Sequence, residues 1–180
     1  IILGLESARQ AVASLKKGRR IEELEQFALN DSMTGFYNRN AYDYFIYNET
    51  NIKNYMVVTF DLNNLKMCND NYGHSSGDAY IIHSAHIIET TFDRFGKCYR
   101  IGGDEFCCLI PDAAEFQIER FIQKMQQDIA ILNNKNIIPT EVGIACGYAL
   151  ATPDDADIEK VRERADEMMY HNKKVLKGLI

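Results

Sequence analysis

The sequence predicts an α+β domain of the split β-α-β type, in which helices flank a central, mostly antiparallel sheet. Three observations predict it. A β-branched and aromatic run is followed by a helical pattern, two short apolar runs stand on either side of a glycine turn, and a further helix, strand and helix follow. The expected order of elements is β-α-β-β-α-β-α. At 180 residues the chain fits one such domain and an appendage.

Each element is predicted by a local pattern. Residues 55–62 are the clearest strand, because β-branched and aromatic residues dominate them. Helices are expected where apolar residues recur at helical spacing, and acidic residues open the last one, as suits its positive end. The expected helices are residues 41–47, 77–92, 113–132 and 155–176, and the other expected strands are residues 98–101, 106–110 and 140–150.

Residues 5–28 also have helical spacing, but the apolar register changes around residues 16–20, which argues against one unbroken coiled-coil seam. One interpretation is a helix that packs on the domain, and the other is a signalling linker that brings two copies together. The sequence leaves both open. We divide the chain into an N-terminal helical linker from an upstream sensor or regulatory region, residues 1–29, and a domain at residues 30–180.

Composition excludes some classes of function. The formal net charge of −6 argues against bulk, non-specific binding to nucleic acid, although a single phosphate site needs only a few local cations. Five cysteines without CxxC spacing are expected to be reduced thiols. No run is long enough to span a membrane, and no signal peptide is visible. We therefore expect a cytoplasmic segment, with any membrane or sensor part outside it.

Residues 102–106 read Gly-Gly-Asp-Glu-Phe and are expected to form the tip of a hairpin. Glycine allows positive φ angles and the close approach of another molecule. The adjacent carboxylates of Asp104 and Glu105 are costly unless a cation neutralises them. Asp61, at the end of the clearest strand, would meet them at the sheet edge. Three carboxylates from two segments predict a divalent metal site. The alternative is that Asp61 only caps the turn that follows it.

Residues 69–78 combine glycines with polar side chains ahead of an expected helix. Gly73 and Gly77 indicate a loop whose free backbone N–H groups could face an anion. Asn69 and Asp78 supply an amide and a carboxylate, which together match the edge of guanine. The alternative is ordinary loop and helix-cap chemistry.

Four separated motifs, in this order, resemble the GGDEF family of diguanylate cyclases. They cover about residues 30–177, and the signature itself is intact and preceded by Arg100. The family patterns are similar to residues 31–39 (D-x-L-T-G-L-x-N-R), residues 61–78 (D-I-D-x-F-K-x-x-N-D-x-x-G-H-x-x-G-D), residues 102–106 (the signature) and residues 164–173 (R-A-D-x-A-x-Y-x-A-K).

The resemblance implies a palm-like sheet, shared with nucleotide polymerases and class III cyclases. It also implies an enzyme that condenses two GTP molecules into cyclic di-GMP and two pyrophosphates by two-metal phosphoryl transfer. One domain would hold one GTP, so catalysis would need a homodimer.

The implied site follows residue by residue from the matching positions. Asp104 would help to deprotonate a ribose 3′-hydroxyl. The implied ligands of two Mg²⁺ or Mn²⁺ ions are Asp61, the Leu62 carbonyl, Asp104 and Glu105. The implied nucleotide contacts are Asn69 and Asp78 to guanine, and Asn64, Leu65, Lys66, Lys173 and Lys177 to the phosphates. The implied catalytic residues are Asp104, Glu105, Lys66 and Lys173.

The chain departs from the family pattern at a few positions. Asn63 replaces an aspartate and Leu65 a phenylalanine, which we interpret as mild retuning. Lys177 stands for an arginine, which keeps charge but loses a bidentate phosphate contact. Residues 93–96 lack the R-x-x-D of the product-inhibition site, so we expect no feedback inhibition of the usual kind. Asp78 favours cyclic di-GMP over a mixed dinucleotide. The alternative function is a catalytically weak or inactive GTP-binding sensor domain.

Overall fold

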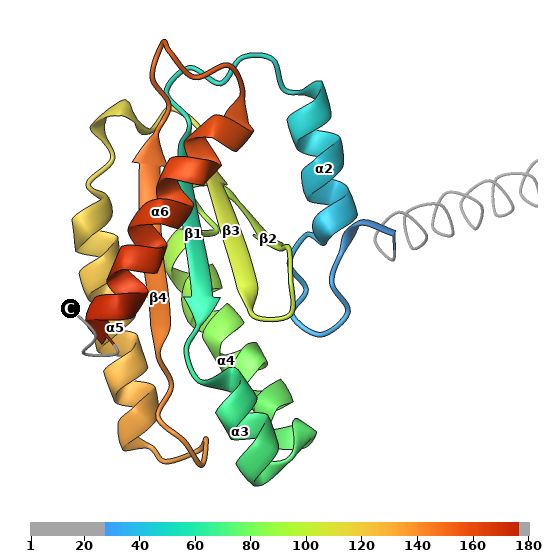
Figure 1. Ribbon diagram of the computed structural model, residues 1–180, viewed down its shortest axis with the longest axis vertical. Helices are drawn as coiled ribbons and strands as arrows, with labels where there is room; N and C mark the ends of the chain where they lie inside the picture. Colours follow the sequence, from blue (N-terminus) through green and yellow to red (C-terminus); the bar gives the residue numbers. More distant parts are fainter. Residues whose placement is uncertain (1–27, 177–180) are drawn as a thin grey trace, which may run out of the picture.

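The computed structural model describes residues 28–176 (Figure 1). Nearly all of the helix expected at residues 5–28 lies outside the described residues, and so does Lys177. The division of the chain at residues 29 and 30 therefore stays a prediction.

Four strands form one sheet in the order β2-β3-β1-β4, and every neighbouring pair is antiparallel (Figure 1). This confirms the predicted antiparallel α+β sheet. The long central strand β1 pairs on both of its edges, whereas β2 and β4 are the outer strands. The strands are β1 (Met56–Leu62), β2 (Lys97–Arg100), β3 (Glu105–Ile110) and β4 (Ile144–Leu150).

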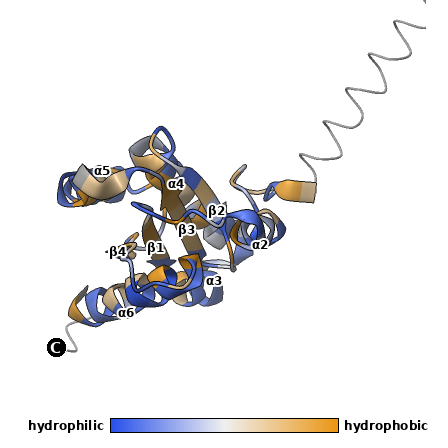
Figure 2. Ribbon diagram, turned by 90° about the horizontal axis from the view of Figure 1, so that it is seen from above, coloured by the Kyte–Doolittle hydropathy of each residue, from blue (hydrophilic) through white to orange (hydrophobic). Residues whose placement is uncertain are grey.

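Helices cover both faces of the sheet, so every residue of β1 is buried (Figures 1 and 2). Side chains alternate along a strand. Val58 and Phe60 therefore face one layer of helices, while Val57 faces the other. Each fully buried large apolar side chain contributes roughly 1.5–3 kcal/mol. One layer contains α4 (His74–Phe92) and α5 (Ile118–Asn134), and the other contains α2 (Arg39–Asn48) and α6 (Ile158–Leu176).

The loop expected at residues 69–78 was a wrong prediction. Most of this segment is helical, because α3 (Leu65–Tyr72) runs up to Gly73 and α4 begins at once with His74. Only Gly73 breaks the helix, with a φ of 83° that favours glycine. Gly77 lies inside α4 and is required for another reason, which concerns the site.

Two other boundaries differ from the expected ones. The helix expected from residue 113 is interrupted after η1 (Ala113–Glu115), because Phe116 has extended backbone angles. Strand β4 begins four residues later than expected, at Ile144. Before it, the Asn133 side chain accepts from Val142 N–H at 2.8 Å and donates to the Val142 carbonyl at 2.9 Å. These bonds satisfy backbone groups that would otherwise pair with a strand.

Helix α6 approaches the sheet closely at Gly147 of β4. A Cβ atom at Gly147 would lie 2.2 Å from both the Ala165 carbonyl oxygen and the Met169 nitrogen. Near the end of the helix, the Asn172 side chain accepts a bond from Cys146 N–H at 3.3 Å. The sheet therefore fixes the backbone of α6 beside the next residue, Lys173.

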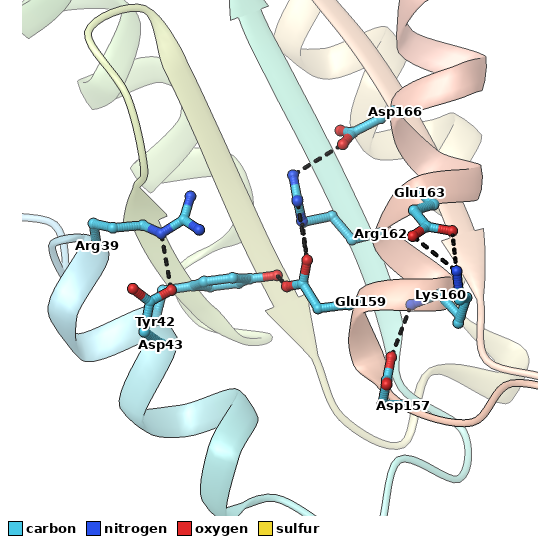
Figure 3. A network of polar contacts seen from close by, with 9 residues as sticks. All are labelled: Arg39, Tyr42, Asp43, Asp157, Glu159, Lys160, Arg162, Glu163 and Asp166. Atoms are coloured by element: carbon cyan, nitrogen blue, oxygen red, sulfur yellow. Dashed lines mark hydrogen bonds and ion pairs between the residues drawn. The ribbon is translucent and has the colours of Figure 1, made fainter.

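A polar network joins α2 to α6 (Figure 3). The buried Tyr42 hydroxyl donates to Glu159 at 2.7 Å, and Arg162 bridges Glu159 and Asp166 at 3.0 and 2.9 Å. Burial raises the pKa of Tyr42 well above its usual value, and the pKa of Asp166 is also raised by burial, against the charge of Arg162. The network satisfies the polar groups between the two helices.

All five cysteines lie in the described part of the chain, and all are free and buried. The prediction of unpaired thiols is thus confirmed. Burial raises the pKa of Cys146 to about 12, and a high pKa leaves little of the reactive thiolate at neutral pH. These cysteines therefore serve the core of the domain.

Candidate functional site

The end of β1 and the tip of the β2–β3 hairpin lie side by side. Asp61 is the register partner of Glu105, so their side chains start from adjacent positions on one face of the sheet. The Leu62 N–H donates to the Asp104 carbonyl at 3.0 Å. The three predicted carboxylates thus come from neighbouring backbone positions, although 43 residues of chain separate Asp61 from Asp104.

The carboxylate of Asp61 pairs with a residue from a third segment. Its Oδ1 accepts a hydrogen bond from Lys173 Nζ of α6 at 2.5 Å, and the two side chains are only 12% and 26% exposed. Partial burial reduces screening by water, which strengthens such a pair relative to one on the surface. Sequence reasoning had given both residues roles but had not paired them.

The carboxylate of Glu105 lies over the hairpin turn. A Cβ atom at Gly102 would be 3.0 Å from Glu105 Oε2, so the missing side chain makes room for this carboxylate. Between residues 28 and 176, no three histidine, cysteine or acidic side chains are arranged closely enough to hold a metal ion. The donor types still fit a hard divalent cation, which prefers oxygen ligands. The metal-binding role of Asp61, Leu62, Asp104 and Glu105 therefore stays a prediction.

Arg100 anchors the hairpin tip, a role that sequence reasoning missed. Its Nη2 donates to the Gly103 carbonyl at 2.8 Å, and its Nη1 donates to Asp31 Oδ1 at 3.0 Å. Asp31 also accepts from the Thr34 N–H and hydroxyl at 2.9 and 2.7 Å. The available signal was the arginine directly before the turn, together with the aspartate in the first motif.

Burial by itself would raise the pKa of Asp31. The hydrogen bonds from Thr34 and Arg100 and the positive charge of Arg100 outweigh it, so the pKa lies below its ordinary value. The carboxylate is therefore ionised at neutral pH and holds the arginine against the tip.

A cavity of about 460 Å³ adjoins the end of β1. Asn64 has a left-handed backbone, with φ 62°, and turns the chain from β1 into α3. Its side chain caps no helix N–H, so the first N–H groups of α3 point from the helix end without an intrahelical partner. The cavity brings together most of the predicted phosphate and metal residues: Leu62, Asn64, Leu65, Lys66, Asp104 and Lys173.

Asn69 and Asp78 do not line this cavity. They lie on the adjoining helices α3 and α4, Asn69 half-buried and Asp78 exposed. A Cβ atom at Gly77 would lie only 1.9 Å from Asn69 Oδ1. Gly77 therefore allows the Asn69 amide to pack against α4, next to Asp78.

Comparisons with known proteins agree with this architecture. A family described as "Diguanylate cyclase, GGDEF domain" matches residues 28–177. Diguanylate cyclase DgcN of Escherichia coli is 31% identical over 157 residues, which are 84% of this chain and 38% of the relative. Diguanylate cyclase DgcS of Shewanella oneidensis is 26% identical over 168 residues, 88% of this chain and 54% of the relative. The chain spans about half or less of the length of these curated relatives.

A solved structure shares the fold. It contains the coiled coil and GGDEF domain of DgcB from Caulobacter crescentus in complex with c-di-GMP. The TM-score is 0.77 at 23% identity, over 93% of this chain and 94% of the other. The fold is thus that of a GGDEF domain. With the family match over residues 28–177, the chain belongs to the GGDEF diguanylate cyclase family.

Within residues 28–176, no helix combines the length and the apolar character that crossing a membrane requires.

Proposed function

We propose that this domain is a diguanylate cyclase that condenses two GTP molecules into cyclic di-GMP with release of two pyrophosphates. One observation carries the proposal. The end of β1 and the hairpin tip place Asp61, Asp104 and Glu105 at adjacent positions, beside a cavity that Lys66 and Lys173 also line. Carboxylates and cations in one cleft suit a substrate that carries phosphates and divalent metal.

The metal ligands in this proposal are Asp61, the Leu62 carbonyl, Asp104 and Glu105, holding two Mg²⁺ or Mn²⁺ ions. When bound, the ions supply charge neutralisation at the phosphates and activation of the attacking oxygen. The protein contributes the placement of the ligands. The backbone bond from Leu62 to Asp104 and the anchor from Arg100 to Gly103 hold the two ligand-bearing segments in register.

The nucleotide contacts divide into a phosphate part and a base part. Lys66, Lys173 and the free N–H groups at the start of α3 bind the triphosphate. Asn69 and Asp78 read guanine, and Lys177 contributes a further phosphate contact. Asp104 accepts the proton of the ribose 3′-hydroxyl, which then attacks the α-phosphate of the second GTP.

Two copies must meet, because one domain in this proposal holds a single GTP and the reaction joins two. We propose a homodimer in which two such cavities face each other, with residues 1–29 as the link to an upstream sensor or regulatory region. The setting is the cytoplasm, where GTP is available, and a membrane is involved only through regions outside this segment.

A second candidate is a GTP-binding sensor domain without turnover. The ion pair of Asp61 with Lys173 favours it, because this contact neutralises a proposed metal ligand. Similarity alone does not decide between the two functions. Among the relatives, PdeR of Escherichia coli is named a cyclic di-GMP phosphodiesterase and is 29% identical over 163 residues.

The experiment that decides is turnover by the full chain with GTP and Mg²⁺, measured as pyrophosphate release and as cyclic product by chromatography. We expect cyclic di-GMP from the wild type and none from Asp104→Asn, which keeps the shape of the side chain but removes its charge. GTP binding without product, over a range of protein concentrations that includes the dimer, would establish the sensor function instead.

A further inference from the structure

We propose that Lys173 and the divalent cation compete for the carboxylate of Asp61. Lys173 is the internal counter-ion of the metal-free domain, and arrival of the metal releases its ammonium group toward the substrate phosphates. The inference rests on the proposed function, because it assumes that Asp61 is a metal ligand. It adds a coupling between metal and nucleotide binding through one side chain.

The first step is the contact itself. Lys173 Nζ lies 2.5 Å from Asp61 Oδ1, and both side chains are mostly shielded from water. An ammonium group at this distance occupies the position that a cation bound to the same oxygen would take. Two cations cannot share it, because their charges repel strongly in a partly buried setting. Metal binding to Asp61 therefore requires Lys173 to leave.

The second step explains why the pair forms without metal. Asp61 and Glu105 are direct register partners on antiparallel strands, and like charges in that arrangement destabilise a sheet. Lys173 brings a positive charge to this position from α6. It thereby stabilises a sheet edge that a metal would otherwise have to neutralise.

The third step concerns how Lys173 leaves. The backbone of α6 is held against β4, since the bond from Cys146 N–H to Asn172 precedes Lys173 directly and Gly147 allows close packing. The helix thus stays in place, and only the flexible side chain of Lys173 moves.

The cavity that Lys173 lines also contains Lys66 and the start of α3. Phosphates bound there attract the released ammonium group. Metal and nucleotide each favour the same position of Lys173, so each is expected to tighten the binding of the other.

The test measures Mn²⁺ binding to the full chain without nucleotide, by electron paramagnetic resonance. Lys173→Met removes the competing charge and should bind Mn²⁺ at least about fivefold more tightly than the wild type, the lower end of typical coupling between sites. Lys173→Arg keeps the charge and should bind as weakly as the wild type. Lys174→Met is the matched control, because its ammonium group lies 4.4 Å from the Tyr170 ring and not on Asp61. It should leave Mn²⁺ binding unchanged.

Thermal unfolding supplies a second readout and shows that the variants fold. Metal-free Lys173→Met should melt below the wild type, and saturating Mn²⁺ should raise its melting temperature by more. In Asp61→Asn/Lys173→Met the gain in Mn²⁺ affinity should disappear.

Equal Mn²⁺ affinity in the wild type and Lys173→Met would overturn the competition and leave the proposed cyclase intact. Absence of Mn²⁺ binding from both proteins, with and without GTP, would overturn the metal-dependent function together with the inference.

Discussion

Arg100 and Asp31 lie 69 residues apart in the chain and form an ion pair of 3.0 Å at the base of the hairpin tip. The same guanidinium group donates to the Gly103 carbonyl. A single side chain therefore connects the segment that opens the described domain to the turn that carries Asp104 and Glu105. The position of the turn depends on this connection as well as on strand pairing.

Arg100→Met should lower both stability and turnover. It removes two hydrogen bonds and leaves the partly buried Asp31 carboxylate without its cation, which costs roughly 1–3 kcal/mol. Urea unfolding and pyrophosphate release measure the two effects. Arg39→Met is the matched control, because the pair of Arg39 with Asp43 is about half exposed, and it should change stability by less than about 1 kcal/mol. Equal losses in the two variants would contradict the anchoring role.

The Asp31 carboxylate should make stability depend on pH. Its pKa in the folded protein lies below the ordinary value of 3.8, so it contributes stability above that pH and loses it as the pH falls through the folded pKa. Asp31→Asn should therefore be less stable than the wild type at pH 7, and the difference should narrow below about pH 4. Urea unfolding across this range tests the expectation. A difference that stayed constant down to pH 3 would show that charge is not the cause.

Gly77→Ala should weaken GTP binding without unfolding the protein. An added Cβ meets the Asn69 amide, the far end of a side chain that can move, and alanine is the better helix former by about 1 kcal/mol. The cost falls on base recognition. Loss of one hydrogen bond, about 0.5–1.5 kcal/mol, should raise the GTP dissociation constant several-fold. Calorimetric titration measures it, with Ser75→Ala on the same helix as control, and unchanged GTP affinity would exclude a role for this contact.

Gly147→Ala should destabilise the domain through α6. The added Cβ meets backbone atoms of the helix at 2.2 Å, so the whole helix has to shift, at roughly 1–3 kcal/mol. The shift also moves Lys173 relative to Asp61. Gly143→Ala is the control, since its Cβ would approach only the Asn63 side chain, at 3.4 Å. A smaller loss of melting temperature for Gly147→Ala than for Gly143→Ala would refute the close-packing argument.

Product should not inhibit this domain in the manner usual for the family. Residues 93–96 lack the R-x-x-D pattern, and a Cβ atom at Gly96 would lie 2.1 Å from the Leu109 carbonyl oxygen. An aspartate at position 96 therefore requires β3 to shift. We expect steady-state rates to stay constant as cyclic di-GMP is added in the micromolar range. Inhibition there would reveal a product site of another kind.

Much of the fold could be predicted from local pattern, because apolar periodicity reports which face of an element is buried. Residues 55–62 contain β1, and the turn at residues 102–106 separates β2 from β3. The errors occurred where side chains override periodicity. Glycines suggested a loop at residues 69–78, but only Gly73 adopts a positive φ, and Gly77 serves the packing of Asn69.

The sequence by itself determined the family, the order of the elements and the chemical groups that reach the sheet edge, since motifs and periodicity are properties of short segments. Only the tertiary structure decided which of those groups meet. Lys173 lies on Asp61 across 112 residues of chain, and Arg100 reaches both Asp31 and Gly103. These contacts depend on how closely α6 packs on β4 and on how strands align, and a local pattern does not encode such long-range geometry.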